Sequence, residues 1–348
     1  RDRLAFGDRE LGAALAAHAP GPPARPRDCR LNMTKAQYLG RLERVKRHIV
    51  DGDTYQVNYT LKYKFRHEGA PLALFAALRE RQRVEYGAYL DFPGLTVLSR
   101  SPELFFEKRG GRARTRPIKG TAGRGTTPAA DRRRADALAA DPKARAENVM
   151  IVDLLRNDLS RVGRPGTVEA SDLFAIETYA TLHQMVSTVS ARVDEGLSLS
   201  DVLRHLFPCG SITGAPKVRT MELIRELEVE PRGVYTGAIG HLSPDGSMCF
   251  NVAIRTLALR PDGSGEMGVG GGIVHDSDPE AEYEECRLKG RFLTGDEPER
   301  PPTAPTRGEP GRSPLDHDAL EPPPFEHHAT EPSPLERADG EAPPPPPP

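Results

Sequence analysis

The 348-residue sequence has no tryptophan and only four cysteines, which lie far apart without a CxxC pair. This spacing excludes a zinc knuckle or a disulfide framework, so we expect reduced thiols in a cytoplasmic protein. No apolar run approaches the 18 or so residues that cross a bilayer, so we expect no membrane-spanning helix. The first residues lack both an initiating methionine and the apolar core of a signal peptide, so we expect them to be internal to a longer chain.

Acidic and basic residues are spread unevenly along the chain. From Asp296 onward 12 acidic residues stand against 4 arginines, a net charge of −8, which leaves +6 on the rest because the whole chain carries −2. The arginines of this basic part are scattered and not gathered in a stripe with aromatic residues, which argues against nucleic acid as a partner. The charge fits a small anionic substrate better.

Composition divides the chain into three parts. Residues 1–30 form a partial amino-terminal segment with a Pro-rich lead-in, and residues 31–295 form one continuous globular region. Residues 296–348 hold 17 of the 34 prolines and no lysine. That last part cannot bury enough apolar surface to offset its chain entropy, so we predict an acidic, Pro-rich disordered tail or linker.

Hydrophobic periodicity predicts the elements of the globular region. Helices are expected at 34–52, 145–162, 215–228 and 277–293, and strands at 55–65, 85–92, 95–99, 103–108, 234–242, 248–259 and 265–274. The strands 95–99 and 103–108 are predicted to form a hairpin. Many non-consecutive strands with long helices between them predict an α+β fold, a layered sandwich of mainly antiparallel sheets flanked by helices.

The last predicted helix carries charges on one stripe. It should begin with a capping box over Ser277–Glu280, and Glu282, Glu285 and Lys289 follow at helical spacing. Alone, this pattern is typical of a solvated face with a Glu–Lys pair. Glu147, on the helix at 145–162, adds a third carboxylate, and three carboxylates that converge from two helices would suit Mg²⁺.

Two glycine-rich stretches do not match the nucleotide-binding motifs. "GVGGGI" at 268–273 does not satisfy GxGxxG, and "GSITGAPK" at 210–217 lacks the GK[ST] ending of a P-loop. Neither supports ATP or NAD as a ligand. Both can still offer backbone N–H groups to a carboxylate, and the second precedes a predicted helix, whose N-terminus favours anions.

Four stretches, in this order, resemble the chorismate-binding enzymes: "PIKGTAGR", "ENVMIVDLLRNDLSRV", "GSITGAPKVRTMELI" and "EYEECRLKGRF". That family includes component I of anthranilate synthase and of aminodeoxychorismate synthase, and the isochorismate and salicylate synthases. The resemblance covers about residues 31–295. The amino-terminal portion common in the amide-linked synthases is missing, which fits a chain that starts midway.

The resemblance implies a metal site. By position, Glu147 and Glu285 would bind Mg²⁺ with Glu282 close by, and the metal would hold the ring carboxylate of the substrate. The chain departs from the family pattern nearby, since Cys286 stands where threonine is common and Ala144 stands at a position that is often acidic. These departures bear on metal affinity more than on fold.

The resemblance also implies substrate-binding and catalytic residues. Six residues match positions that grip the carboxylates of chorismate: Tyr235, Arg255, Lys289 and the backbone of Gly270, Gly271 and Gly272. Glu103 matches the general acid that assists departure of the C4 hydroxyl, and His183 matches a histidine near that hydroxyl. Read without the family, Tyr235 and Arg255 are ordinary strand residues and His183 is a partly buried imidazole with satisfied hydrogen bonds.

Two residues bear on which member of the family the chain resembles most. Members that add water carry a lysine as base where this chain has Gln56, and an amide cannot take a proton from water, so the expected nucleophile is ammonia. Lys119 stands where anthranilate synthases carry alanine, and the lysine form is that of aminodeoxychorismate synthase. Its implied role is covalent catalysis, for which the amine must be neutral, and neighbouring Arg116 and Arg124 would favour the neutral form.

Ammonia would come from a separate glutaminase subunit. The chain contains neither the GxCxG elbow nor the HxE pair of such an enzyme, and Cys209 lies in "FPCGS". The expected activity is therefore a Mg²⁺-dependent amination of chorismate in p-aminobenzoate and folate biosynthesis. Two alternatives stay open: anthranilate synthase component I, and a catalytically silent fragment whose Pro-rich tail is an interaction module.

Overall fold

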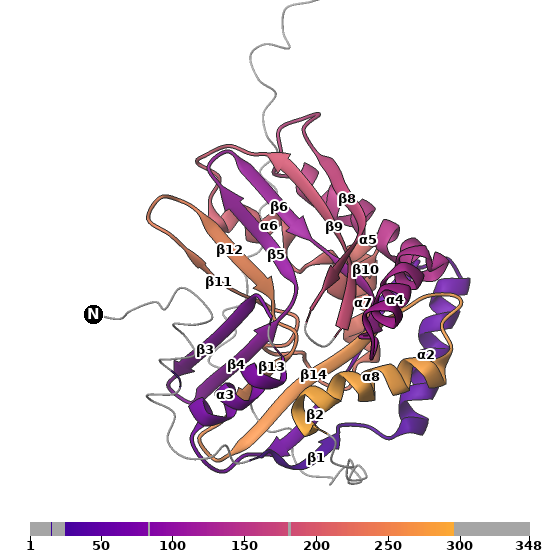
Figure 1. The fold of residues 1–348 in the computed structure, drawn as a ribbon, viewed down its shortest axis with the longest axis vertical. Helices are drawn as coiled ribbons and strands as arrows, with labels where there is room; N and C mark the ends of the chain where they lie inside the picture. The colour runs from indigo at the N-terminus through magenta and orange to yellow at the C-terminus, as the bar shows by residue number, and fades with distance from the viewer. Residues whose placement is uncertain (1–14, 16–24, 83, 180–181, 296–348) are drawn as a thin grey trace, which may run out of the picture. The chain divides into compact units, whose positions relative to one another are not determined.

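A computed structural model describes Leu15 and residues 25–82, 84–179 and 182–295. The predicted tail at 296–348 lies outside these residues. The described strands form two sheets, which fill the lower and upper halves of Figure 1. All strand pairs are antiparallel, which confirms the predicted α+β fold.

The first sheet, sheet A, has the order β1-β2-β14-β13-β4-β3, with β10 on the edge of β2. Its strands are β1 (Arg27–Leu31), β2 (Gln56–Arg66), β3 (Tyr86–Phe92), β4 (Leu95–Ser101), β10 (Gly214–Ala215), β13 (Thr256–Leu259) and β14 (Ser264–Ile273). The second, sheet B, has the order β11-β12-β5-β6-β9-β7, with β8 on β9. Its strands are β5 (Leu104–Arg109), β6 (Arg112–Arg116), β7 (Ile118–Gly123), β8 (Glu169–Thr178), β9 (Leu182–Arg192), β11 (Ala238–Leu242) and β12 (Met248–Val252).

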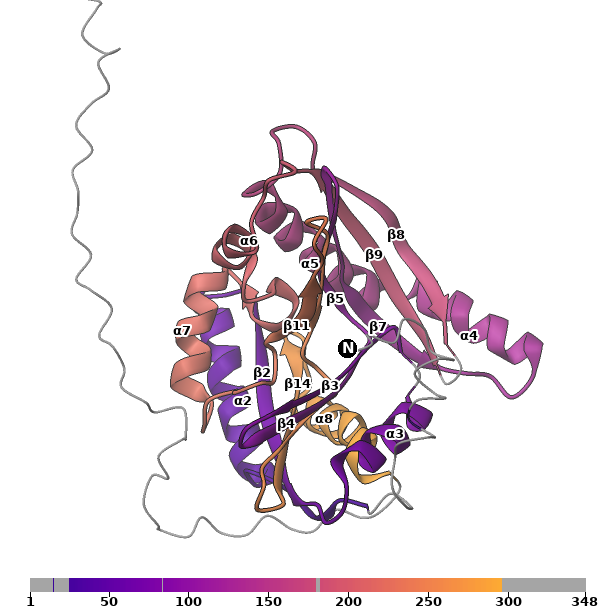
Figure 2. The same ribbon diagram turned by 90° about the vertical axis from the view of Figure 1, so that its left-hand side faces the viewer.

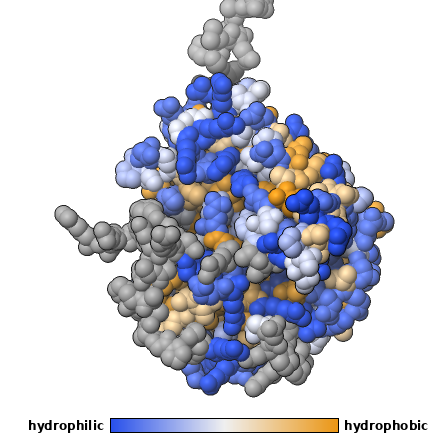
Figure 3. Space-filling model, in the orientation of Figure 1, coloured by the Kyte–Doolittle hydropathy of each residue, from blue (hydrophilic) through white to orange (hydrophobic). Residues whose placement is uncertain are grey.

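Helices flank both sheets (Figure 2). They are α2 (Lys35–Val50), α3 (Pro71–Arg81), α4 (Pro128–Ala140), α5 (Pro142–Ser160), α6 (Leu199–Leu206), α7 (Lys217–Leu227), α8 (Pro279–Thr294) and the short 3₁₀ helix η1 (Gly210–Ile212). One apolar core joins sheet A to α2, α3, α7 and α8, and a second joins sheet B to α5 and α6. None of the helices described is long and apolar enough to span a membrane. On the face shown in Figure 3, most of the coloured surface is blue and hydrophilic, with smaller orange areas between.

Strand β2 shows why the helices lie where they do. Its odd-numbered residues from Val57 to Phe65 belong to the core shared with the helices, and strand geometry directs its even-numbered polar residues to the opposite face. Helix α8 lies very close to β2, because a Cβ atom on Gly290 would be 2.4 Å from the ring of Tyr63. The polar face of β2 lies on the side away from these helices and contributes to the site described below.

The start of α8 differs from the prediction. The N-cap is Asp278, whose side chain accepts a hydrogen bond from the backbone N–H of Ala281. The predicted capping box over Ser277–Glu280 is wrong. Instead, the hydroxyl of Ser277 donates a hydrogen bond to the carboxylate of Glu282 at 2.8 Å. The serine therefore stabilises a carboxylate of the site described below.

Three strand predictions were wrong, and each error lies at the junction of the sheets. Strands β4 and β5 form no hairpin, because β4 pairs with β3 and β13 in sheet A and β5 pairs with β6 and β12 in sheet B. The predicted strand 248–259 is two strands, β12 and β13, in different sheets. Strand β11 begins only at Ala238, which leaves Tyr235 in a loop. The alternation of apolar and polar residues continues through the crossovers, the segments where the chain passes from one sheet to the other. The pattern therefore does not show that the chain changes sheets.

Candidate active site

Two crossovers between the sheets run side by side and bring Glu103 and Arg255 together. The backbone N–H of Arg100 donates to the carbonyl of Arg255 at 3.0 Å, and that of Val252 donates to the carbonyl of Glu103 at 3.0 Å. The hydroxyl of Ser101 donates to the carbonyl of Val252 at 2.6 Å. Arg255 has φ of 50°, a left-handed conformation that is strained for a non-glycine residue. The crossovers thus fix two polar side chains at the sheet junction.

A cavity of about 200 Å³ opens at this junction. Of the thirteen residues that the sequence predicts for the site, eleven line it: Glu103, Lys119, Glu147, Tyr235, Arg255, Gly270, Gly271, Gly272, Glu282, Glu285 and Lys289. They come from β7, β14, α5, α8, both crossovers and the loop before β11. The structure therefore assembles one site from segments that span most of the globular region.

His183 is not brought into this cavity. Its ring nitrogens lie 2.9 Å from the hydroxyl of Thr178 and 2.9 Å from the carboxylate of Asp131, and it faces a separate hollow near the start of α4. Side chains alternate along a strand, so Gln184, the next residue on β9, lines the cavity instead. A direct contact of His183 with the substrate finds no support in this geometry.

Gln56 also lies outside the lining, but next to it. A Cβ atom on Gly272 would be 2.9 Å from the side-chain nitrogen of Gln56. Gln56 is buried, and this nitrogen has no hydrogen-bond partner among the residues that the structure describes. The side chain of Gln56 therefore occupies the space that a side chain at position 272 would need.

Lys119 enters the cavity from β7. It makes no ion pair with any residue in the described ranges, in contrast to the two arginines that flank it in sequence. Arg116 pairs with Glu177, and Arg124 pairs with Asp131 at 2.7 Å. Each of these two arginines is therefore balanced by a carboxylate of its own. The lysine amine remains available to a ligand.

Burial shifts the titration of Glu103 toward its protonated form. The side chain is 6% exposed, and removal of the carboxyl group from water raises its pKa, although a hydrogen bond from Ser211 and the charges of Lys119 and Lys289 oppose the rise. A carboxyl group that keeps its proton near neutral pH can donate it. This environment suits the predicted general acid.

The three carboxylates predicted to bind metal face the same cavity in different electrostatic states. Burial raises the pKa of Glu147 and of Glu282, and the nearby charge of Glu285 adds to each rise. Burial also acts on Glu285, but Lys289, whose amine lies 2.6 Å away, and other cations together lower its pKa. Carboxylate oxygens that repel one another across a cavity are suitable donors for Mg²⁺. Among the described residues, however, no three His, Cys, Asp or Glu side chains lie in an arrangement that could hold a metal ion.

Ala144 and Cys286, the two residues that depart from the family pattern, do not line the cavity. Ala144 is buried with Leu138 and Met185 in a small apolar cluster beneath β7. Cys286 is buried on the far side of α8, where its sulfur lies 3.7 Å from the hydroxyl of Tyr38, and burial raises the pKa of its thiol to about 11. Neither residue therefore changes the set of carboxylates that faces the cavity.

Tyr235 and Arg255 enter the cavity from the loop before β11 and from the crossover between β12 and β13. The ring of Tyr235 lies flat against Gly268, where any Cβ atom would be 2.1 Å from the ring. Arg255 is partly buried, which lowers its pKa, and it donates a hydrogen bond to the side chain of Gln82 at 2.8 Å. A partly buried guanidinium without a carboxylate partner among the described residues is a good receptor for a ligand carboxylate.

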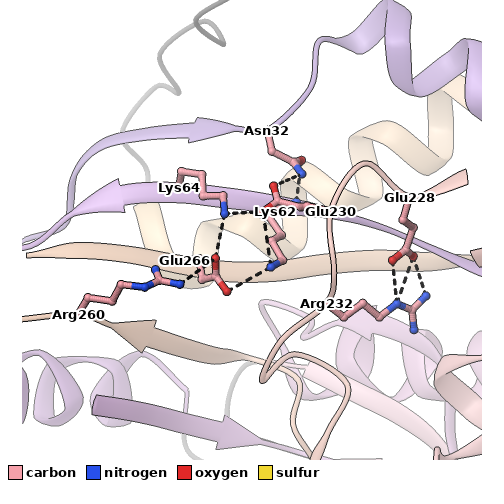
Figure 4. A network of polar contacts seen from close by, with 8 residues as sticks. All are labelled: Asn32, Lys62, Lys64, Glu228, Glu230, Arg232, Arg260 and Glu266. Carbon is pink, nitrogen blue, oxygen red and sulfur yellow. Dashed lines mark hydrogen bonds and ion pairs between the residues drawn. The ribbon is translucent and has the colours of Figure 1, made fainter. Parts of the chain in front are cut away.

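A polar network holds the loop that carries Tyr235 (Figure 4). Lys62 and Lys64 on β2 both contact Glu266 of β14, at 3.1 and 2.9 Å, and Lys64 contacts Glu230 of the loop at 2.7 Å. Arg232, also in the loop, pairs with Glu228 at 2.7 Å. Because Lys62 and Glu266 are nearly buried, this network ties the loop firmly to the polar face of sheet A.

Sequence reasoning missed other polar residues of the lining. They are Asn58, Thr121, Lys143, Gln184 and Ser211. Ser211 lies within the "GSITGAPK" stretch and Asn58 lies two residues after Gln56, so both were within reach of the motifs. Gln184 could be found only because side chains alternate along a strand, so that the neighbour of His183 faces the other side of β9.

The site combines a buried carboxyl group with a raised pKa, a lysine without an ion pair among the described residues, receptors for carboxylates and three carboxylates on two helices. This arrangement is that of an enzyme acting on a small anionic molecule. The sequence profile of the family described as chorismate binding enzyme matches residues 7–295. The chain belongs to the chorismate-binding enzyme family.

Individual relatives agree with this assignment. The chain is 45% identical over 260 residues to anthranilate synthase component 1 of Haloarcula marismortui, covering 75% of this chain and 53% of that protein. It is 44% identical over 254 residues to aminodeoxychorismate synthase component 1 of Salmonella typhimurium, covering 73% and 56%. The crystal structure of anthranilate synthase component I from Streptococcus pneumoniae superimposes with a TM-score of 0.72 at 30% identity, covering 84% of this chain and 67% of that one.

The chain spans about half the length of the curated relatives it matches. The two kinds of synthase are equally similar to it, so overall identity does not choose between them. The choice depends on individual residues of the cavity.

Proposed function

We propose that the chain is the chorismate-aminating part of an aminodeoxychorismate synthase, with ammonia supplied by a glutaminase subunit. The observation that carries the proposal is Lys119, which lines the cavity without an ion-pair partner among the described residues and lies near Glu103, whose pKa burial raises. Anthranilate synthases, which carry alanine at this position, have no amine there. The proposed reaction belongs to p-aminobenzoate and folate biosynthesis in the cytoplasm.

The proposed chemistry uses Lys119 as a temporary nucleophile. Its neutral amine bonds to C2 of chorismate while both conjugated ring double bonds shift and the C4 hydroxyl leaves as water with the proton of Glu103. Ammonia then bonds to C4, both double bonds shift back, and the bond from C2 to the lysine breaks. The proton that the added ammonia loses returns to Glu103. The products are 4-amino-4-deoxychorismate and water, and the lysine amine is restored.

The other residues bind and orient the substrate. Tyr235, Arg255 and Lys289 would hold carboxylates, and the missing side chains of Gly270–Gly272 leave room for the ring. Glu147, Glu282 and Glu285 would hold Mg²⁺, which when bound would supply positive charge for the ring carboxylate. No metal-bound step is needed to explain the roles of Lys119 and Glu103.

Product analysis by mass spectrometry tests the proposal. The chain is incubated with chorismate, Mg²⁺ and ammonium, and we expect 4-amino-4-deoxychorismate and an adduct on the peptide that contains Lys119. Lys119→Ala should lose most of this product, and the slow residual route should place nitrogen at C2, as in anthranilate synthases. Lys143→Ala is the matched control, because it removes another cavity lysine and should retain the product and the adduct.

Two results would contradict the proposal. If Lys119→Ala forms the same product at an unchanged saturating rate, Lys119 is only a charged residue of the lining. If the wild-type chain forms anthranilate, the chain is an anthranilate synthase component, which the 45% identity to such a protein makes the second candidate.

A further inference from the structure

A β-bulge in β7 lies at the proposed nucleophile. Two residues of β7, Lys119 and Gly120, stand against a single residue of β9, Met185, because the pairing shifts by one position between Ile118 and Thr121. Gly120 has φ of 84°, a left-handed conformation that glycine adopts readily. Such an extra residue bends the strand and redirects the side chains beside it. The direction of Lys119 therefore depends on how β7 is aligned with β9.

The parts of β7 before and after the bulge would direct Lys119 to opposite faces of the sheet. Residues that pair directly in an antiparallel ladder share a face. The alignment before the bulge, continued to Lys119, would pair it with Met185, which belongs to the apolar cluster beneath β7. The alignment after the bulge, continued back to Lys119, pairs it with Val186, which shares a face of β9 with Gln184 of the cavity lining. Because Lys119 lines the cavity, residues 121–123 set its direction.

Helix α4 lies beside β7 and β9 (Figure 2), and Asp131 in its first turn holds the end of this segment. The carboxylate of Asp131 accepts hydrogen bonds from Nε and Nη2 of Arg124 at 2.8 and 2.7 Å, and from the backbone N–H of Gly125 at 2.8 Å. Arg124 and Gly125 directly follow β7. The same carboxylate lies 2.9 Å from Nε2 of His183 on β9, the residue that pairs with Ala122 of β7. One carboxylate therefore ties the end of β7 to β9.

Other contacts hold the same turn against the helix. The guanidinium of Arg124 also donates to the carbonyl of Tyr179 at 2.6 Å, and Arg134 of α4 donates to the carbonyl of Arg124 at 2.7 Å. A Cβ atom on Gly125 would lie 2.2 Å from the backbone nitrogen of Asp131, so the turn lies directly against the start of α4. The hydrogen bonds from Arg124 and Gly125 lower the pKa of Asp131, which therefore stays ionised at neutral pH.

We propose that Asp131 is a positioning residue for Lys119, because it holds the end of β7 to β9 and α4 and so keeps the alignment that directs the amine into the cavity. This inference rests on the proposed function, in which that amine is the nucleophile. Asp131 is not among the residues that line the cavity, so it acts on the reaction through β7. His183 then serves as one of the anchors of Asp131 and not as a contact of the substrate.

Steady-state turnover of chorismate with ammonium and Mg²⁺ tests the inference. Asp131→Asn keeps the size of the side chain and removes the charged acceptor, and kcat for 4-amino-4-deoxychorismate should fall roughly 10- to 100-fold, since a small displacement of a reacting group is costly. KM for chorismate should change by less than about twofold, because the receptors for its carboxylates lie on other elements. The share of product with nitrogen at C2 should rise. Unchanged kcat and product shares would overturn the inference.

Asp53→Asn is the matched control. The carboxylate of Asp53 is also shared by an arginine and a histidine, since it lies 3.3 Å from Nε of Arg219 and 2.7 Å from Nδ1 of His48. Asp53 precedes β2 and is not among the residues that line the cavity. This variant should keep the kcat and the product of the wild type. Equal losses of kcat in the two variants would count against a special role for Asp131.

The same substitution in a Lys119→Ala background separates positioning from a general structural role. Without the lysine amine Asp131 has nothing to position, so the double variant should form the residual product as fast as Lys119→Ala does. A further loss, by the factor seen with the lysine present, would overturn the inference and leave the proposed function intact. If Asp131→Asn does not fold, Arg124→Gln, which removes two of the hydrogen bonds, takes its place in each comparison. A wild-type chain that forms no 4-amino-4-deoxychorismate would overturn both.

Discussion

Gly120 and Ala144 lie so close that a Cβ atom on Gly120 would be 2.9 Å from the Cβ atom of Ala144. Through these two small residues, β7 lies directly against α5. Lys119 precedes Gly120 on β7, and Glu147 lies one helical turn after Ala144 on α5. The close approach therefore helps to bring the lysine and the carboxylate to the same cavity.

Gly120→Ala should destabilise the fold and impair the site together. Gly120 has φ of 84°, which costs about 1–2 kcal/mol for alanine, and the crowding against Ala144 should add about 1–3 kcal/mol. Urea unfolding measures the free energy, and turnover of chorismate with ammonium should fall because Lys119 is displaced.

Gly166→Ala is the matched control for this variant. Gly166 has φ of 73°, but no atom lies within 4 Å of the added Cβ position. It should lose only the conformational part of the free energy and keep its turnover. Equal losses for the two variants would mean that the contact between β7 and α5 has no special role.

Glu103→Gln should change how stability depends on pH. The folded state raises the pKa of Glu103, so between the ordinary carboxyl pKa and the raised one the folded chain binds more protons than the unfolded chain. Stability from this group is thus lost as pH rises. Thermal midpoints measured from pH 5 to pH 8 should fall less steeply in Glu103→Gln than in the wild type.

The same substitution should lower turnover by roughly 100-fold or more, because glutamine cannot give a proton to the leaving hydroxyl. Wild-type turnover should also decline as pH rises through the raised pKa of Glu103. An alkaline limb of the pH–rate profile that persists unchanged in Glu103→Gln would assign the titration to another group.

Removal of Mg²⁺ should abolish activity. Turnover in excess chelator should be lost and then restored by added Mg²⁺, and Glu285→Gln should lower turnover by more than roughly tenfold with an unchanged fold by circular dichroism. Glu284→Gln is the control, because Glu284 lies on the same helix and contacts Lys35 and Arg287 instead of the cavity. Full activity in excess chelator would contradict the proposed role of Mg²⁺.

The chain should use ammonium and not glutamine. It lacks the GxCxG and HxE elements of a glutaminase, and burial raises the pKa of Cys209 to about 12, which leaves a poor nucleophile. Glutamate release, measured with purified chain and glutamine, should therefore be absent until a glutaminase subunit is added. Glutamate formed by the chain alone would contradict this.

Local patterns in the sequence predicted those helices whose ends are set by neighbouring residues. Helices α2, α5, α7 and α8 were predicted within a few residues, because helical periodicity and polar caps are encoded in neighbouring residues. Strands β6 to β9 and helices α3, α4 and α6 went unpredicted, since their patterns are short or strongly polar. The family motifs named eleven of the residues that line the cavity, but without them Tyr235 and Arg255 looked like ordinary strand residues.

The sequence by itself determined the fold class and the family, and with them the residue types of the cavity. Only the tertiary structure decided that β4 and β5 belong to different sheets, that Glu103 and Arg255 lie on two antiparallel crossovers beside one cavity, and that His183 faces away from that cavity. The physical reason is that these relations join segments that are far apart in the sequence, through hydrogen bonds such as the one from Ser101 to Val252, two residues that are 151 positions apart. Periodicity reports which face of an element is buried, and it carries no information about which distant element covers that face.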